Sequence, residues 1–191
     1  MAMPGGVLVG IARHARPKGP MELLETVEVT LDGGLDGDCR GRVKPNGRGR
    51  RQVTLMERGD WQAAMTELGQ AIPWQERRAN LLLDGIDIPQ VPGTRIRIGT
   101  VELEITVECD PCFRMEAVAP GLEAALTPDW RGGACTRVKA GGRIALGDAV
   151  TIVEPDDDLF SVIPGSTRDQ EPHMTSRAAL DPGLRRHDGP L

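Results

Sequence analysis

Two closely spaced cysteines are the residues of this chain best suited to do chemistry. The segment Cys109-Asp110-Pro111-Cys112 follows an alternating apolar run and is itself followed by Arg114. A thiol held in a proline-stiffened turn beside an arginine is well placed to lose its proton. Because thiolates are nucleophiles and soft metal ligands, the cysteines are where we expect the chemistry.

The residues alone leave several interpretations of this motif open. A dithiol redox pair normally lies at a helix N-terminus in a βαβ unit, which the sequence lacks. A zinc site would need two further ligands, and Cys39 and Cys135 are single residues without a second paired spacing. A third interpretation is one functional thiol, Cys112, with Cys109 incidental. The plain alternative is that these cysteines are small apolar core residues.

A glycine-rich loop leads into a basic stretch. Residues 33–42 include four glycines around Asp36, Asp38 and Cys39, and residues 40–51 carry six basic side chains and no acidic one. Glycines let a ligand approach the backbone, and the basic side chains favour an anion. No aromatic residue is interleaved, so base stacking with nucleic acid is not expected. An anion cradle and a solvated surface loop both fit this pattern.

Two other loops place arginine beside a strand start. Arg77-Arg78-Ala79-Asn80 precedes an apolar run of leucines, and Arg131-Gly132-Gly133 precedes the run that begins near Cys135. Loops at strand ends can meet on one rim of a barrel. The three arginine-bearing loops and the cysteines are therefore predicted to converge.

Short strand-like runs dominate the elements that must position these residues. Val101, Leu103, Ile105 and Val107 alternate with polar residues, and Gly99-Thr100 predicts a tight hairpin before them. Strands are predicted at residues 6–12, 25–31, 52–56, 80–83, 94–98, 101–107, 135–138 and 149–153. Many strands without regularly interleaved helices predict a mainly β fold, a closed β-barrel with a few peripheral helices.

Two segments are predicted to be helical. Residues 57–68 place Trp61, Ala64, Met65 and Leu68 on one stripe, and Gly69 follows as a C-terminal stop. Residues 114–126 form the second, with an interruption at residues 120–121, Pro-Gly. Both helices are expected to lie outside the barrel.

Composition sets the domain organisation and the cellular setting. Residues 1–154 are predicted to form one domain, and residues 155–191, which begin with acidic residues and are rich in proline, a flexible and disordered tail. Only four cysteines, no basic stretch before the N-terminal apolar run and no membrane-length apolar segment predict a cytoplasmic protein that does not enter a membrane. The net charge of −5 argues against a nucleic-acid partner.

The order and spacing of these pieces resemble the MOSC domain, the module found at the C-terminus of molybdenum cofactor sulfurases and as small bacterial proteins. The resemblance covers residues 6–153. It rests on seven segments: residues 37–38 (Gly-Asp), 51–55 (Arg-Gln-Val-Thr-Leu), 78–81 (Arg-Ala-Asn-Leu), 93–99 (between two glycines), 111–112 (Pro-Cys), 131–133 (Arg-Gly-Gly) and 142–148 (Gly-Arg-Ile-Ala-Leu-Gly-Asp).

The resemblance implies a MOSC-type β-barrel in which Cys112 matches the family's hallmark cysteine. In relatives that residue is regarded as a molybdenum ligand or a sulfur carrier. The implied cofactor is the molybdenum cofactor (molybdopterin), and the implied site walls are Asp38, Arg40, Arg78, Asn80, Arg114 and Arg131. Many members have a histidine after the Gly-Asp pair, where this chain has Arg40 preceded by Cys39.

Two activities follow from the resemblance: reduction of a small N-hydroxylated substrate, as a molybdenum-dependent oxidoreductase, or transfer of sulfur. An electron-donor protein would serve the first and a separate cysteine desulfurase the second. No pyridoxal phosphate is expected, because that cofactor belongs to a different domain of the full-length sulfurases. The alternative from another class is a module that binds or carries a pterin or an anion without turnover.

Overall fold

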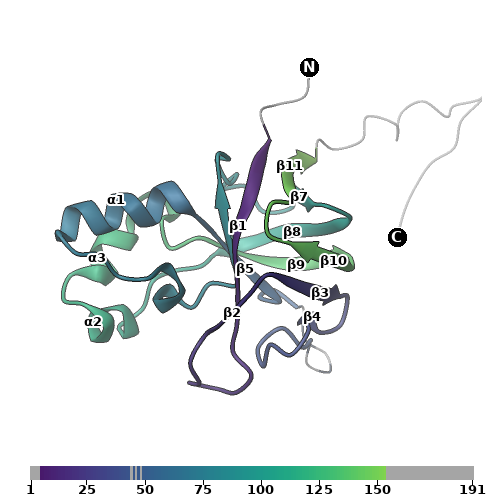
Figure 1. The fold of residues 1–191 in the computed structure, drawn as a ribbon, viewed down its shortest axis with the longest axis horizontal. Helices are drawn as coiled ribbons and strands as arrows, with labels where there is room; N and C mark the ends of the chain where they lie inside the picture. Colours follow the sequence, from purple (N-terminus) through teal and green to yellow (C-terminus); the bar gives the residue numbers. More distant parts are fainter. Residues whose placement is uncertain (1–4, 44, 46, 48, 154–191) are drawn as a thin grey trace, which may run out of the picture. The chain divides into compact units, whose positions relative to one another are not determined.

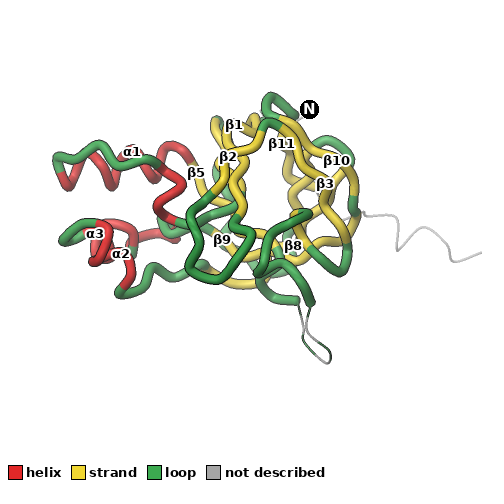
Figure 2. The backbone as a smooth tube through the Cα atoms, turned by 60° about the horizontal axis from the view of Figure 1, so that its bottom comes forward, coloured by secondary structure: helices red, strands yellow, loops and turns green. Residues whose placement is uncertain are grey.

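The computed structural model describes residues 5–43, 45, 47 and 49–153. The predicted tail, residues 155–191, lies outside this part of the chain. Within it the fold is mainly β, and seven strands close a barrel (Figures 1 and 2). The elements are β1 Gly6–Arg13, β2 Glu22–Leu24, β3 Thr26–Thr30, β4 Gly34–Leu35, β5 Val53–Glu57, α1 Arg58–Leu68, a 3-10 turn Trp74–Arg77, β6 Leu81–Asp84, β7 Arg95–Ile98, β8 Val101–Glu108, α2 Arg114–Val118, α3 Leu122–Leu126, a 3-10 turn Pro128–Trp130, β9 Ala134–Ala140, β10 Gly142–Ala145 and β11 Ala149–Val153.

The barrel runs in the order β11-β7-β8-β9-β5-β6-β1, and β1 pairs with β11 to close it. Most described neighbours are antiparallel, whereas β5 and β6 are parallel, with Leu55 opposite Leu81. Strand β2 extends the sheet beside β1, and β10, β3 and β4 form a small second sheet. The predicted closed barrel with peripheral helices is confirmed.

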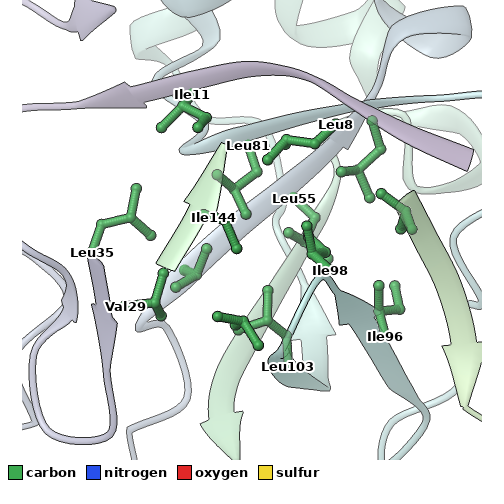
Figure 3. Close-up of a cluster of buried hydrophobic side chains, with 14 of the residues drawn as sticks. Leu8, Ile11, Val29, Leu35, Leu55, Leu81, Ile96, Ile98, Leu103 and Ile144 are labelled. Carbon is green, nitrogen blue, oxygen red and sulfur yellow. The ribbon is translucent and has the colours of Figure 1, made fainter. Parts of the chain in front are cut away.

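Aliphatic side chains from both sheets fill the barrel (Figure 3). Leu55, Leu81 and Leu103 come from barrel strands, and Val29 and Ile144 from the small sheet. All five are at most 2% exposed. One continuous core therefore holds the small sheet on the barrel, and burial of such side chains is the main stabilising term in folding.

A second apolar cluster lies between the barrel wall and the helices. Met56 of β5 and Leu82 of β6 turn away from the barrel interior and pack with Trp61 of α1 and Leu122 of α3. Both faces of β5 and β6 are thus buried, which explains their nearly uninterrupted apolar sequences. Figure 2 shows the three helices on one side of the ring of strands.

The helix predictions are confirmed, with one refinement. On α1, Trp61 and Ala64 are buried, and Gly69 ends the helix in the left-handed conformation at φ 61°. The predicted interruption separates α2 from α3. The Glu116 carboxylate then accepts hydrogen bonds from the backbone N–H groups of Gly121 and Glu123, at 3.0 and 3.1 Å, which stabilises the start of α3.

Candidate functional site

A buried carboxylate joins three segments at one end of the barrel. Asp38 follows the short strand β4, and its Oδ2 accepts a hydrogen bond from Nδ2 of Asn80 at 2.8 Å. The same oxygen lies 3.1 Å from Nδ1 of His14, and Oδ1 accepts from the backbone N–H of Arg40 at 2.7 Å. Asn80 also accepts from the backbone N–H of Thr54 at 3.0 Å. This network fixes the glycine-rich loop against β1, β5 and β6.

His14 is held as a neutral imidazole. Its ring is 1% exposed, and burial lowers the pKa of His14, with the positive charges of Arg78 and Arg40 acting in the same direction against Asp38. If Nδ1 carries the proton shared with Asp38, Nε2 offers a lone pair. That Nε2 is buried and has no hydrogen-bond partner among the described residues.

Arg78 presents donors that the described part of the protein does not use. The residue has a left-handed backbone, with φ 65°, and its NH1 group donates to the Gly19 carbonyl at 2.9 Å. Its Nε and Nη2 atoms are buried and have no hydrogen-bond partner within the described ranges. Buried guanidinium N–H groups are costly when unpaired, so these two are suited to a ligand with acceptor oxygens.

Four arginines gather around this point. The pKa of Arg40 is lowered by burial and then by the positive charges of Arg51, Arg78 and Arg114. Arg40 and Arg51 come from the loop between β4 and β5, Arg78 from the loop before β6, and Arg114 from the start of α2. Like charges held together around one point favour an anionic ligand that neutralises them.

Arg40, Arg42 and Arg51 line one wall of a cleft, which we call the basic cleft. It has a volume of about 610 Å³ and is lined by Cys39, Arg40, Arg42, Val43, Pro45 and Arg51. A second hollow of about 530 Å³, which includes Gly33, Gly37 and Asp38, shares Cys39 and Arg42 with it. Volumes of this size are typical of small-molecule and cofactor sites.

The two cysteines of the predicted motif have opposite environments. Cys109 is 1% exposed at the end of β8, and its backbone N–H donates to the Gly133 carbonyl at 2.8 Å. Cys112 is exposed in the turn before α2, and its carbonyl accepts from the N–H of Met115 at 2.7 Å. The exposed thiol is the one accessible to a ligand or partner.

The turn that carries these cysteines packs against Arg77. One NH2 group of Arg77 donates to the Cys109 carbonyl at 2.6 Å and approaches the Asp110 carbonyl at 3.5 Å. A Cβ atom on Gly132 would lie 2.5 Å from the Cys109 carbonyl and 3.0 Å from this NH2 group. Glycine is therefore required at position 132 for the turn to sit against Arg77.

The Cys109 sulfur accepts hydrogen bonds from two guanidinium groups. The Nη2 atom of Arg77 lies 3.3 Å from the Cys109 Sγ atom, and the Nη2 atom of Arg51 lies 3.4 Å from it. The pKa of Cys109 is lowered, first by a hydrogen bond from the Cys135 thiol and then by Arg77 and Arg51, which together outweigh burial. Since Arg51 also lines the basic cleft, it links this sulfur to the cleft.

Most of the predicted site residues come together, and one has a partner elsewhere. Asp38 and Asn80 are hydrogen-bonded, and Arg40, Arg78 and Arg114 belong to the arginine group. Arg131 instead donates to Glu67 of α1 at 2.6 Å and to the Ala125 carbonyl at 3.3 Å. A role of Arg131 in binding stays a prediction from the sequence.

Four residues in or beside the site were not predicted as site residues: His14, Arg51, Arg77 and Cys135. Arg51 lies within the basic stretch of residues 40–51, so that signal was present. His14 was identifiable only as the histidine outside the predicted tail. Nothing in the sequence pairs Arg77 or Cys135 with Cys109, because those contacts depend on strand register.

Comparison with known proteins identifies the class. A family model described as the MOSC domain matches residues 37–151, more than half of the chain. The protein belongs to the MOSC domain family, which is associated with binding of the molybdenum cofactor or with sulfur carriage. The matched range contains Asp38, Arg78, Cys112 and the strands from β5 to β11 that carry or support them.

Solved structures of bacterial MOSC proteins share the fold. YuaD from Bacillus subtilis is 19% identical with a TM-score of 0.67, over 80% of this chain and 98% of that one. YiiM from Escherichia coli is 15% identical with a TM-score of 0.56, over 78% and 70%. YiiM from Geobacillus stearothermophilus is 17% identical with a TM-score of 0.54, over 78% and 73%. No curated protein matches the chain.

The described part of the chain contains no helix that is both long and apolar enough to span a bilayer.

Proposed function

We propose that this protein binds the molybdenum cofactor in the basic cleft and uses the Cys112 thiolate as a molybdenum ligand or sulfur carrier. The observation that carries this proposal is the arrangement of Arg78, whose Nε and NH2 atoms are buried without described partners. It lies in a group of arginines dense enough to lower the pKa of Arg40.

The side chains present fit a cofactor with a phosphate and an oxygen- and sulfur-ligated metal. Guanidinium forks bind phosphate oxygens in pairs, which supports Arg40, Arg51 and Arg78 as the contacts to the phosphate in this proposal. The unpartnered Nε2 of neutral His14 supplies an acceptor for an N–H or O–H group of the ligand. A soft thiolate suits molybdenum or a persulfide sulfur, and Cys112 is the exposed thiol.

When bound, the cofactor would supply two-electron oxidation and reduction at its metal. The chain's own residues hold and orient it. Asp38 fixes the loop that bears Arg40, Asn80 fixes Asp38 to β5 through Thr54, and Arg114 follows Cys112 by two residues. An exposed Cys112 is open both to a small N-hydroxylated substrate and to a protein that delivers electrons or sulfur.

In this proposal the activity is either the reduction of a small N-hydroxylated substrate or the transfer of sulfur to or from the cofactor. The partners are an electron-donor protein or a separate cysteine desulfurase, and pyridoxal phosphate has no place in this chain. The protein would act in the cytoplasm, where its four free cysteines, Cys39, Cys109, Cys112 and Cys135, stay reduced.

The test is elemental analysis with pterin detection on protein purified from a host that makes the cofactor. Wild type should hold molybdenum and pterin, and Cys112→Ser should lose most of the molybdenum. Arg78→Gln should weaken cofactor binding by roughly 1.5 to 3 kcal/mol, because a charge-assisted contact is lost. Arg97→Gln is the matched control, since its guanidinium lies on β7 and is paired with Glu102.

Equal molybdenum in wild type and Cys112→Ser would contradict the ligand role. Pterin or phosphate bound without turnover and without molybdenum would instead support the carrier alternative. Wild-type affinity in Arg78→Gln would contradict the cradle. Assays with an N-hydroxylated amidine and a small reductant, and separately with a persulfide donor, would distinguish reduction from sulfur transfer.

A further inference from the structure

The Cys109 and Cys135 sulfurs form a buried pair that the proposed function does not use. Strands β8 and β9 lie side by side in the barrel wall (Figure 1). Cys135 is opposite Val107 in the register, and the Cys109 N–H bonds to the Gly133 carbonyl. The two cysteines are therefore diagonal neighbours on one face of the ladder, close enough for the Cys135 thiol to donate a hydrogen bond to Cys109.

The surroundings of Cys109 differ from those of a cysteine that only fills space. A buried anion is costly unless charged donors compensate it, and here two guanidinium groups aim N–H bonds at Sγ. The Cys135 thiol is the third donor, and the pKa of Cys135 is raised by this hydrogen bond and by burial. The two guanidinium donors therefore favour the thiolate form of Cys109, and the hydrogen bond and burial favour the thiol form of Cys135.

We propose that Cys109 and Cys135 are a peroxide-sensitive dithiol that closes to a disulfide and leaves Cys112 free. The Cys109 thiolate attacks one oxygen of a hydroperoxide, the O–O bond breaks and hydroxide leaves, so Cys109 becomes a sulfenic acid. The Cys135 sulfur then attacks Cys109, the S–S bond forms, and the oxygen leaves as water with the thiol proton. The sulfur pair loses two electrons, and the peroxide gains them.

The geometry supports both halves of this sequence. A thiolate held by guanidinium groups is the reactive form of cysteine, and a thiol already in contact with it can trap the sulfenic acid before further oxidation. Hydrogen peroxide is small enough to reach a sulfur that is largely enclosed. Arg51 is exposed, lines the basic cleft and donates to Cys109 Sγ, so this sulfur is separated from solvent by one side chain.

Disulfide formation would alter the basic cleft. It removes the Cys109 thiolate, which accepts a hydrogen bond from Arg51, and so leaves the Arg51 guanidinium free to bind an anion. Exchange with two molecules of a small thiol would reopen the disulfide and restore the thiolate. The pair would couple oxidation at Cys109 to the anion affinity of the cleft, whatever ligand occupies it, so the inference does not depend on the proposed function.

The test is a peroxide titration of the full-length reduced protein, followed by alkylation of free thiols, trypsin digestion and mass spectrometry. Residues 98–114 and 132–137 are tryptic peptides that carry Cys109 with Cys112 and Cys135, respectively. Peroxide, added from substoichiometric amounts to a few-fold excess, should link these two peptides. The linked species should weigh two hydrogens less than the sum of the two peptides and carry one alkylated cysteine, Cys112. The linked species should persist in Cys112→Ser and Cys39→Ser and disappear in Cys135→Ser.

Two further results would support or overturn the proposal. Arg51→Gln should shift to higher pH the point below which disulfide formation slows, because one of the two guanidinium groups that hold Cys109 as the thiolate is lost. Cys135→Ser should accumulate sulfenic acid, detected with a dimedone probe, at Cys109. A disulfide within residues 98–114, no link in Cys112→Ser, or alkylation of both buried cysteines after oxidation would overturn it.

Discussion

Two buried acceptor side chains, Asp38 and Cys109, are bonded to residues that line the basic cleft, and they are held in different ways. Asp38 is bonded by an imidazole, an amide and a backbone N–H, whereas Cys109 is bonded by two guanidinium groups and a thiol. The carboxylate fixes three segments of backbone. The thiolate can lose its charge by oxidation. The Asp38 side therefore frames the cleft, and the Cys109 side can change it.

A second contrast lies within the cysteine motif itself. Cys109 and Cys112 are three residues apart, yet one is 1% exposed and the other open to solvent. Spacing alone suggests one dithiol unit. The end of β8 buries the first cysteine in the barrel wall, and the turn toward α2 carries the second away from it, which separates their roles.

The largest expected effect is on the Asp38 side. Asp38→Ala leaves His14, Asn80 and the Arg40 backbone N–H without their common acceptor, so we expect a loss of about 3 to 5 kcal/mol in the free energy of unfolding. Chemical denaturation at pH 7 measures it. Asp36→Ala, at an exposed position two residues earlier, is the control and should change stability by less than about 0.5 kcal/mol.

A loss below about 1 kcal/mol in Asp38→Ala would show that the cleft does not depend on this carboxylate. Cofactor binding, measured on the folded fraction, should also fall, because the loop with Arg40 is no longer fixed.

On the cysteine side, Cys109→Ala should destabilise the protein by about 2 kcal/mol. The change removes the acceptor of two guanidinium groups, of which Arg77 is 4% exposed and Arg51 is exposed, so the cost falls mainly on Arg77. Thermal or chemical unfolding under reducing conditions gives the value. The double variant Cys109→Ala/Arg77→Met should recover part of the loss. If it does not, the Arg77–sulfur contact is not what stabilises Cys109.

Much of the fold follows from patterns along the chain. The eight predicted strands and both helical segments correspond to elements of the structure. Their apolar residues alternate as in a half-buried strand, run almost uninterrupted as in β5 and β6, or repeat with the helical period. The short strands β2, β4 and β10 were not predicted. Two to four residues are too few to show alternation, and β10 is defined by its pairing with β3, where Ile144 faces Val27.

The end of β8 shows why sequence alternation has limits. Val107 was grouped with Val101, Leu103 and Ile105 on the buried face, yet it is 39% exposed. The register of β8 against β9 shifts between Ile105 and Val107, and such an irregularity moves the following side chains to the other face. Local sequence carries no signal for this shift.

Candidate site residues were predictable where a loop was itself unusual. The glycine-rich loop, the basic stretch and the cysteine motif led to Asp38, Arg40 and Cys112. The partnership of Cys109 with Cys135 joins segments that meet only through strand pairing and a shifted register. The same is true of His14 and Asp38, which are 24 residues apart in the chain.

The pH dependence of stability should report on His14. Its pKa is lowered from 6.5 in the folded protein, so between the folded pKa and 6.5 the unfolded chain binds more protons. Stability should therefore fall as the pH is lowered below 6.5, with a slope of at most about 1.4 kcal/mol per pH unit. Urea unfolding of wild type and His14→Gln from pH 5 to 8 gives the difference curve. Parallel curves would mean that His14 titrates normally and that burial and the arginines do not fix its neutral form.

The smallest expected effect completes the comparison of the two cysteines. Cys112 is exposed, and its contact with the Met115 N–H is made by the carbonyl, which any residue supplies. Cys112→Ser should therefore change the free energy of unfolding by less than about 0.5 kcal/mol, even where it abolishes molybdenum retention. Parallel denaturation of ligand-free Cys112→Ser, Cys109→Ser and wild type checks this. Destabilisation of Cys112→Ser as large as that of Cys109→Ser would mean that the turn depends on both sulfurs, and a loss of cofactor in Cys112→Ser would then no longer identify a ligand.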